Sequence, residues 1–299
     1  MAFIDDIKRN YRQGSMLMRL IYINIGAFLL LHVVAIAGML FNAGTGILQW
    51  VELPSDPLLL LRRPWTVLTY MFAHYGLLHI LFNMLWLYWL GRIFMEFFSP
   101  KQLSGVYLLG GLGGALLYLL AYNLLPYFAA QPQSFLIGAS ASVIAIVVAT
   151  AVYVPDYKIG LLFLGEVPLK WVAIVTVVID LVGLEGANIG GNLAHIGGAL
   201  VGAWYALSIK GGRDITRPLN AAIDAVVGLF NGRKANPFQR PPRERGSATG
   251  SGAAGRRPGN SVSEDELDAI LGKIKAAGYD ALTDEEKDKL FKASRRRQP

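Results

Sequence analysis

Gly138-Ala139-Ser140-Ala141-Ser142 opens an apolar stretch that runs to Tyr153 without a single charged residue. Small residues lead into the stretch, and valine, isoleucine and alanine make up most of it. Apolar runs of this length predict a helix that is buried in a large core or in a membrane. Polar groups inside lipid are costly, so a serine at the start of such a helix calls for a structural or chemical reason.

The whole chain is more apolar than an ordinary soluble domain. Of its 299 residues 54% are hydrophobic, and the mean hydropathy is +0.41. Several stretches of about 17–25 residues carry few charges, which is the length that a helix needs to cross a bilayer. The chain has no cysteine, which excludes disulfide and thiolate chemistry. We therefore expect an all-α membrane protein.

Six apolar segments predict a bundle of six transmembrane helices. Lysine and arginine gather before the first segment, after the second, after the fourth and after the sixth, whereas only Arg62 and Arg63 lie on the other side. The positive-inside rule then places both termini in the cytoplasm. Because topology accounts for the net charge of +7, we expect no nucleic-acid partner. The six segments cover residues 20–41, 78–97, 103–125, 140–154, 168–184 and 190–208.

This topology brings four polar residues to one membrane depth, because the second, fourth and sixth segments all begin on the outer side. Ser140 opens the fourth segment, and His195 lies near the start of the sixth. His79 and Asn83 begin the second segment and, being four residues apart, share one helix face. Small residues recur every four positions in the fourth and sixth segments, which lets two membrane helices approach closely. These residues are Ala141, Ala145 and Ala149, and Ala194, Gly198 and Gly202.

Serine and histidine at one depth are typical of nucleophilic catalysis. A neutral imidazole such as His195 can take the hydroxyl proton of Ser140 and return it to a leaving group. Backbone N–H groups after Gly138, together with His79 and Asn83, could stabilise an oxyanion. Taken alone, Ser140 also fits an ordinary helix N-cap, and the other three fit polar contacts between helices. The combination of the four favours catalysis.

Other chemistries lack their motifs in this sequence. It has no H-E-x-x-H zinc motif, no glycine-rich nucleotide-binding motif and no pair of membrane aspartates. Asp180 and Glu185 are expected at the membrane interface. A transporter would need polar residues that continue to the midplane, whereas here they cluster at the outer ends. We predict neither a metal nor a cofactor.

Three motifs together resemble those of the rhomboid family of intramembrane serine proteases. They are His79-Ile80-Leu81-Phe82-Asn83, Gly138-Ala139-Ser140 and Ala194-His195-Ile196-Gly197-Gly198, in that order along residues 20–208. The resemblance implies a six-helix bundle with a Ser140–His195 dyad and no third carboxylate. It implies that His79, Asn83 and the Ser140 amide stabilise the oxyanion, and that Gly138 lies against the substrate.

The resemblance also implies partners and a location. The substrates would be transmembrane segments of proteins, cut near the outer face of a bacterial inner membrane. The chain departs from the family pattern at Ala141, where glycine is usual, and at Ile144, where some relatives have tyrosine. The alternative is a non-catalytic relative that binds or extracts membrane helices.

Outside the core, the sequence predicts two cytoplasmic flanks. Residues 1–19 form an N-terminal segment before a membrane core at 20–209. Residues 210–262 are predicted to be a linker rich in basic residues, proline and glycine, which we expect to be disordered over 232–262. Residues 263–299 predict a small helical hairpin, with helix-capping sequences at Ser263-Glu264-Asp265-Glu266 and Thr283-Asp284-Glu285-Glu286. Two short helices bury little surface, so we expect the hairpin to need a partner.

Overall fold

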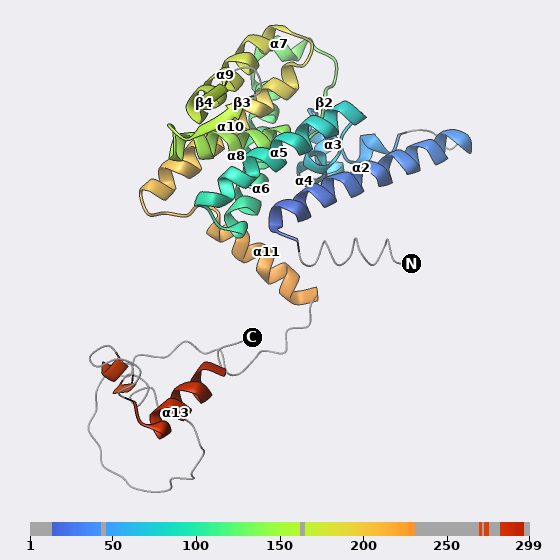
Figure 1. The fold of residues 1–299 in the computed structure, drawn as a ribbon. Helices are drawn as coiled ribbons and strands as arrows, with labels where there is room; N and C mark the ends of the chain where they lie inside the picture. The colour runs from blue at the N-terminus through green and yellow to red at the C-terminus, as the bar shows by residue number, and fades with distance from the viewer. Residues whose placement is uncertain are drawn as a thin grey trace, which may run out of the picture. The chain divides into compact units, whose positions relative to one another are not determined.

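The computed structural model describes residues 14–42, 46–161, 165–230, 269–270, 272–274 and 282–295. The chain divides into two compact units, Met1–Ala235 and Asn236–Pro299. The larger unit is a helical bundle (Figure 1), and each of its six main helices overlaps one predicted segment. These helices are α2 (Met16–Leu40), α5 (Leu77–Phe97), α6 (Pro100–Leu124), α8 (Ser140–Tyr153), α9 (Leu169–Val182) and α10 (Ile189–Lys210).

Short elements connect the helices of the bundle. Strands β1 and β2 pair antiparallel, as do β3 and β4. The short elements are η1 (Leu48–Trp50), β1 (Leu53–Pro54), α3 (Pro57–Arg62), α4 (Thr66–Thr69), η2 (Tyr70–Phe72), α7 (Pro126–Ala129), β2 (Phe135–Leu136), β3 (Lys158–Leu161), β4 (Gly165–Pro168) and η3 (Gly183–Glu185).

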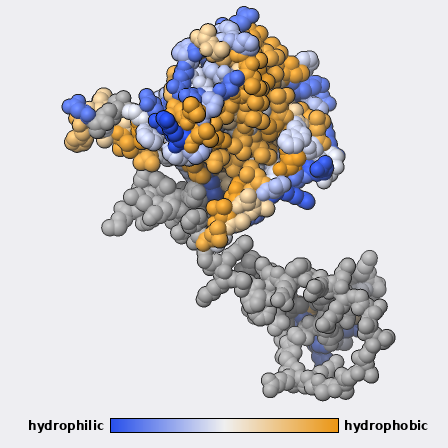
Figure 2. Space-filling view, turned by 180° about the vertical axis from the view of Figure 1, so that it is seen from behind, coloured by the Kyte–Doolittle hydropathy of each residue, from blue (hydrophilic) through white to orange (hydrophobic). Residues whose placement is uncertain are grey.

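Three of the described helices, α2, α5 and α6, are long and apolar enough to cross a membrane. Helices α8 and α9 have 14 residues each, or about 21 Å at 1.5 Å per residue, which is less than the hydrocarbon thickness of a bilayer. Hydrophobic side chains cover much of the bundle surface in Figure 2. Many large apolar side chains of α2, α5 and α9 are exposed, as expected of a surface that faces lipid.

Helix α8 lies at the centre of the bundle, where every residue from Ala141 to Ala151 is buried. Its neighbours α6 and α10 approach through glycines. A Cβ atom at Gly198 would lie 2.8 Å from the carbonyl carbon of Ala141, and one at Gly202 would lie 3.0 Å from that of Ala145. On the α6 side, a Cβ at Gly114 would lie 2.7 Å from the Cβ of Ala141. The predicted close packing of small residues is thereby confirmed.

A buried polar network fixes the segment that precedes α5. The Tyr107 hydroxyl donates to the carbonyl of Met71 (2.8 Å), and the Asn24 amide donates to the Tyr107 oxygen (3.0 Å). The Tyr70 hydroxyl donates to the carbonyl of Gly111 (2.6 Å). Because all of these groups are buried, the loss of one partner would leave another group unsatisfied.

The region predicted as a linker begins with a helix. Helix α11 (Arg217–Phe230) follows α10 after a short turn and belongs to the larger unit. The prediction of a linker over residues 210–262 is therefore wrong for this stretch. Leu219, Ile223 and Val226 recur at helical spacing, and Pro218 stands in the first turn, where proline is tolerated.

In the smaller unit, α13 (Asp284–Arg295) begins at the predicted capping sequence. Thr283 Oγ1 accepts from the backbone N–H of Glu286 (3.4 Å), whose carboxylate accepts from the N–H of Thr283 (3.0 Å). Lys273 forms an ion pair with Glu286, which links α13 to the described helical residues before it. The other predicted cap, at residues 263–266, lies outside the described residues.

Candidate catalytic site

Ser140 and His195 are in direct contact. Ser140 is the first residue of α8, and His195 lies in the second turn of α10. The distance between Ser140 Oγ and His195 Nε2 is 2.6 Å, which is a short hydrogen bond. The glycine packing between α8 and α10 explains how residues 55 positions apart in sequence meet. The geometry is that of a nucleophile beside a general base.

The turn before Ser140 depends on glycine at position 138. Gly138 has a φ of +126°, a backbone conformation that residues with a Cβ atom rarely adopt. A Cβ there would lie 2.8 Å from His79 Nε2 and 3.7 Å from Ser140 Oγ. Gly138 therefore keeps the space between His79 and the serine hydroxyl free. The backbone N–H of Gly138 donates to the carbonyl of Tyr70 (2.9 Å), which fixes the turn against η2.

His74, to which the sequence assigned no role, supports the same turn. It is fully buried in the loop between η2 and α5, and its Nε2 accepts from the backbone N–H of Ala139 (3.4 Å). Burial lowers the pKa of His74 to about 4, so the ring is neutral at pH 7 and its Nε2 is free to accept. Its ring also meets that of His79 edge-on, with centroids 5.0 Å apart. The only sign in the sequence that His74 belongs to this site was its position five residues before His79.

A cavity of about 530 Å³ opens beside Ser140 and His195. Asn83 lines it from α5, and one of its amide hydrogens donates to the carbonyl of His79 (2.9 Å). Since an amide has two donors, the other remains for a ligand. The structure thus brings Ser140, His195 and Asn83 to one cavity, with His79 adjoining at Gly138. The apolar walls come from α5, α8 and α9 and include Phe82, Trp86, Val143, Ile144, Trp171 and Val175.

The expectation of a dyad without a third carboxylate differs from the structure. Asp180 Oδ1, in the last turn of α9, lies 2.7 Å from His195 Nδ1. The side chain of Asp180 is 8% exposed, so it is buried in the site and not interfacial as predicted. The sequence prediction considered only its position near the end of an apolar run, whereas Asp180 lies on the buried face of α9 with Leu169 and Ala173. Glu185, in η3, is exposed.

Ser142, the nearest other serine, points elsewhere. It is fully buried, and a Cβ at Gly111 would lie 2.8 Å from its Oγ. Its hydroxyl has no hydrogen-bond partner within the described residues. The same described residues contain no group of three or more histidine, aspartate or glutamate side chains placed to hold a metal ion.

Exposed apolar helices around an apolar cavity with a few polar groups define a helical membrane protein whose site has the residue types of a serine hydrolase. The chain belongs to the rhomboid family: residues 61–211, half of the sequence, match the Rhomboid domain. The matched range includes Asn83, Ser140, Asp180 and His195.

Two curated proteins are similar to this chain. RHOMBOID-like protein 12, mitochondrial, of Arabidopsis thaliana is 32% identical over 162 residues, which cover 50% of this chain and 48% of that protein. Presenilin-associated rhomboid-like protein A, mitochondrial, of Danio rerio is 27% identical over 137 residues, which cover 45% of this chain and 34% of that protein. The chain spans half or less of the length of these relatives.

Proposed function

We propose that this rhomboid protein is an intramembrane serine endopeptidase that cuts transmembrane segments near the outer membrane face. The observation that carries the proposal is the 2.6 Å contact between Ser140 Oγ and His195 Nε2 beside a cavity of about 530 Å³. Family membership supports it, because the contact joins two of the motifs that resemble those of intramembrane serine proteases.

In this mechanism Ser140 is the nucleophile and His195 the general base. As Oγ attacks the scissile carbonyl, its proton passes to Nε2 and the carbonyl oxygen becomes an oxyanion. The backbone N–H of Ser140 and the free amide hydrogen of Asn83 donate to this oxygen, and His79 adds a donor beside Gly138. His195 then gives the proton to the leaving nitrogen as the C–N bond breaks. A water molecule, deprotonated by His195, then attacks the acyl-enzyme in the same way, and the proton returns to Ser140 Oγ as the second product leaves.

The cavity walls fit a transmembrane substrate. Trp86 of α5 and Trp171 of α9 give it an apolar lining, while Ser140, Asn83 and His195 supply polar groups at one end. An apolar segment is held by the walls, and the peptide bond to be cut must lie locally unwound at the polar end. We assign the entry to the side of α9, whose outward face is apolar and exposed.

The proposal includes a topology of six spans with both termini in the cytoplasm and a membrane core over residues 20–209. The 14-residue helices α8 and α9 then count as short spans, of which α8 is surrounded by the longer helices. We place the protein in a bacterial inner membrane, although the two relatives have mitochondrial names. The C-terminal hairpin would meet its partner in the cytoplasm.

The competing function is that of a non-catalytic relative that binds or extracts membrane helices. Such a protein needs the cavity but has no use for a serine hydroxyl bonded to an imidazole. The contact between Ser140 and His195 therefore favours the protease.

The test is cleavage of a model transmembrane substrate in liposomes. Ser140→Ala and His195→Ala should each abolish cleavage and labelling by a serine-reactive fluorophosphonate, because each removes one partner of proton transfer. Ser142→Ala is the matched control: it removes a hydroxyl two residues away that is buried and lacks a partner among the described residues, so activity should persist. Cleavage retained in Ser140→Ala would refute the proposal.

A further inference from the structure

Asp180 is placed to act on the reaction through His195. Its carboxylate oxygen Oδ1 lies 2.7 Å from Nδ1, while the opposite ring nitrogen, Nε2, lies 2.6 Å from Ser140 Oγ. The three side chains come from three different helices, α8, α9 and α10. They form a line of two hydrogen bonds through one imidazole.

The carboxylate decides which ring nitrogen carries the proton. An ionised carboxylate only accepts hydrogen bonds, so the Nδ1 that faces it must be the donor. The lone pair of the neutral ring then lies on Nε2, facing the hydroxyl hydrogen of Ser140, which is the form that a general base requires. Without Asp180 the ring could adopt the opposite tautomer, which leaves Ser140 with no base.

Burial makes this carboxylate hard to explain by packing alone. The side chain is 8% exposed, and its second oxygen, Oδ2, is buried without a hydrogen-bond partner in the described part of the chain. A buried carboxylate with one partner costs several kcal/mol. A helix contact could be made by an apolar residue without this cost. Transfer of the serine proton to the ring, however, creates a cation that a fixed negative charge stabilises.

We infer that Asp180 is the positioning residue of a Ser140–His195–Asp180 triad. It holds the imidazole with Nε2 toward the serine and stabilises the imidazolium that forms when the Oγ–carbon bond is made. The proton moves from Ser140 Oγ to Nε2 and then to the leaving amine. Asp180 takes up no proton in these steps. This inference rests on the proposed protease function.

The experiment measures kcat and KM of full-length Asp180→Asn in liposomes. The asparagine amide can donate to Nδ1 and so favours the wrong tautomer, and in a soluble triad the same change lowers kcat by about 10⁴. We expect a fall of at least about 100-fold in kcat, with KM changed little, and a matching fall in fluorophosphonate labelling. Glu185→Gln is the matched control, because it removes an exposed carboxylate five residues away and should leave both constants unchanged.

The outcomes separate this inference from the proposed function. If the folded Asp180→Asn protein has the same kcat as the wild type, the role of Asp180 is overturned, whereas the proposed protease function stands. A wild-type protein that neither cleaves nor reacts would overturn the protease itself. If Asp180→Asn fails to fold, nitrogen NMR of wild-type protein decides. The chain has 4 histidines, His195→Ala assigns the signal, and an unprotonated Nδ1 in the neutral ring would overturn the inference.

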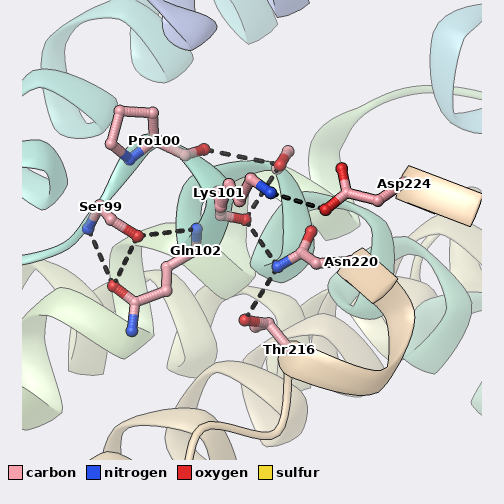
Figure 3. Close-up of polar contacts among 8 residues, drawn as sticks. Ser99, Pro100, Lys101, Gln102, Thr216, Asn220 and Asp224 are labelled. Atoms are coloured by element: carbon pink, nitrogen blue, oxygen red, sulfur yellow. Dashed lines mark hydrogen bonds and ion pairs between the residues drawn. The ribbon is translucent and has the colours of Figure 1, made fainter. Parts of the chain in front are cut away.

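A second, independent observation concerns α11, which is bonded to the bundle through its polar side. Lys101 Nζ pairs with Asp224 (2.6 Å), and the Asn220 amide donates to the carbonyl of Lys101 (3.0 Å) and to Thr216 Oγ1 (3.2 Å), as Figure 3 shows. Lys101 lies in the first turn of α6, which is a candidate membrane span. Helix α11 therefore starts at a membrane surface.

The exposed apolar residues of α11 lie on another side of the helix from these contacts. Val226 and Leu229 are 53% and 82% exposed. On a helical wheel they lie about a third and about a half of a turn from Asn220, and Val226 continues the Leu219–Ile223 line. Arg213 and Arg217, both exposed, stand at its beginning, and Arg233 and Lys234 follow it in the sequence. An exposed apolar stripe with basic ends at a membrane surface is typical of helices that lie in the headgroup layer.

We propose that α11 lies on the same bilayer, with its apolar side in the headgroup region of an anionic leaflet. Its contacts to Lys101 fix its height at the end of α6, and the basic residues add attraction to anionic lipid. This proposal does not depend on catalysis.

Absence of cysteine from the sequence makes the test direct. Full-length Val226→Cys and Leu229→Cys proteins, labelled with an environment-sensitive fluorophore, are placed in nanodiscs of brominated phosphatidylcholine with or without phosphatidylglycerol. We expect quenching at both sites, stronger with phosphatidylglycerol. The matched control Ala221→Cys, on the other side of the helix, should remain unquenched. Equal, weak quenching at all three sites would overturn the proposal, and quenching insensitive to phosphatidylglycerol would overturn its anionic part.

Discussion

Gly198→Ala tests whether the backbone contact between α8 and α10 sets the geometry of the site. The added Cβ would lie 2.8 Å from the carbonyl carbon and 3.1 Å from the Cα of Ala141, and would overlap the carbonyl oxygen. Carbon atoms in contact prefer about 3.5–4.0 Å, so the helices must separate by about 1 Å. The obstacle is the backbone of Ala141, so no side-chain rotation relieves it.

This separation should reach the catalytic contact. Gly198 is three residues after His195, and Ala141 directly follows Ser140. A displacement of about 1 Å would stretch the 2.6 Å contact between Oγ and Nε2 beyond hydrogen-bond length. We expect a loss of about 3 kcal/mol in stability, at the upper end for an overpacked core. Cleavage should fall by about 100-fold, as for a catalytic group misplaced by 1 Å.

The assay compares thermal unfolding in detergent with cleavage in liposomes. Gly26→Ala is the matched control, because Gly26 lies in α2 with nothing within 4 Å of its added Cβ, and it should be neutral. Ala141→Gly should not rescue Gly198→Ala, since the clash is with the carbonyl of residue 141. Wild-type cleavage by Gly198→Ala, or rescue by Ala141→Gly, would refute the packing argument.

Three further predictions concern single side chains. Asn83→Ala should lower kcat by about 10²–10³, because it removes an oxyanion donor, and rates in liposomes check this; an unchanged kcat would exclude that role. Tyr107→Phe should cost about 1–3 kcal/mol in thermal unfolding, since the Met71 carbonyl and the Asn24 amide lose their partner, whereas the exposed Tyr88→Phe should be neutral. His74, whose pKa is lowered to about 4 from 6.5, binds a proton more readily in the unfolded chain. Its contribution is therefore complete above about pH 6.5 and is lost as the pH falls toward 4, by up to about 3 kcal/mol. Thermal unfolding of His74→Gln should show a weaker dependence on pH over this range, and an equal dependence would contradict the assignment.

The sequence predicted the positions of the main helices because the apolar segments of a membrane protein are long and are separated by charged residues. All six predicted segments overlap helices, and the meeting of Ser140 with His195 followed from topology and small residues. The spacing of alanine in α8 and glycine in α10 carried that information, because in each helix the small residues recur every four positions and so share one face.

The sequence did not reveal which residues meet across elements. Asp180 shares the buried face of α9 with Leu169 and Ala173, but a helix face alone does not show that His195 of α10 lies opposite it. His74 reaches Ala139 from a loop 65 positions away, without a helix face to place it. Helix α11 was hidden by its basic and proline-rich surroundings, although its apolar residues have helical spacing.

Two kinds of contact hold the three residues of the site. Ser140 and His195 are set by backbone packing of α8 on α10, which glycine alone permits. Asp180 lies on α9, a helix whose other face is exposed, and is held by one hydrogen bond to His195. If both contacts act through His195, Gly198→Ala and Asp180→Asn should not be additive, because a base that no longer reaches the serine gains nothing from its orientation. The double variant should therefore cleave about as slowly as the slower of the two single variants, and a multiplicative loss would mean that Asp180 acts elsewhere.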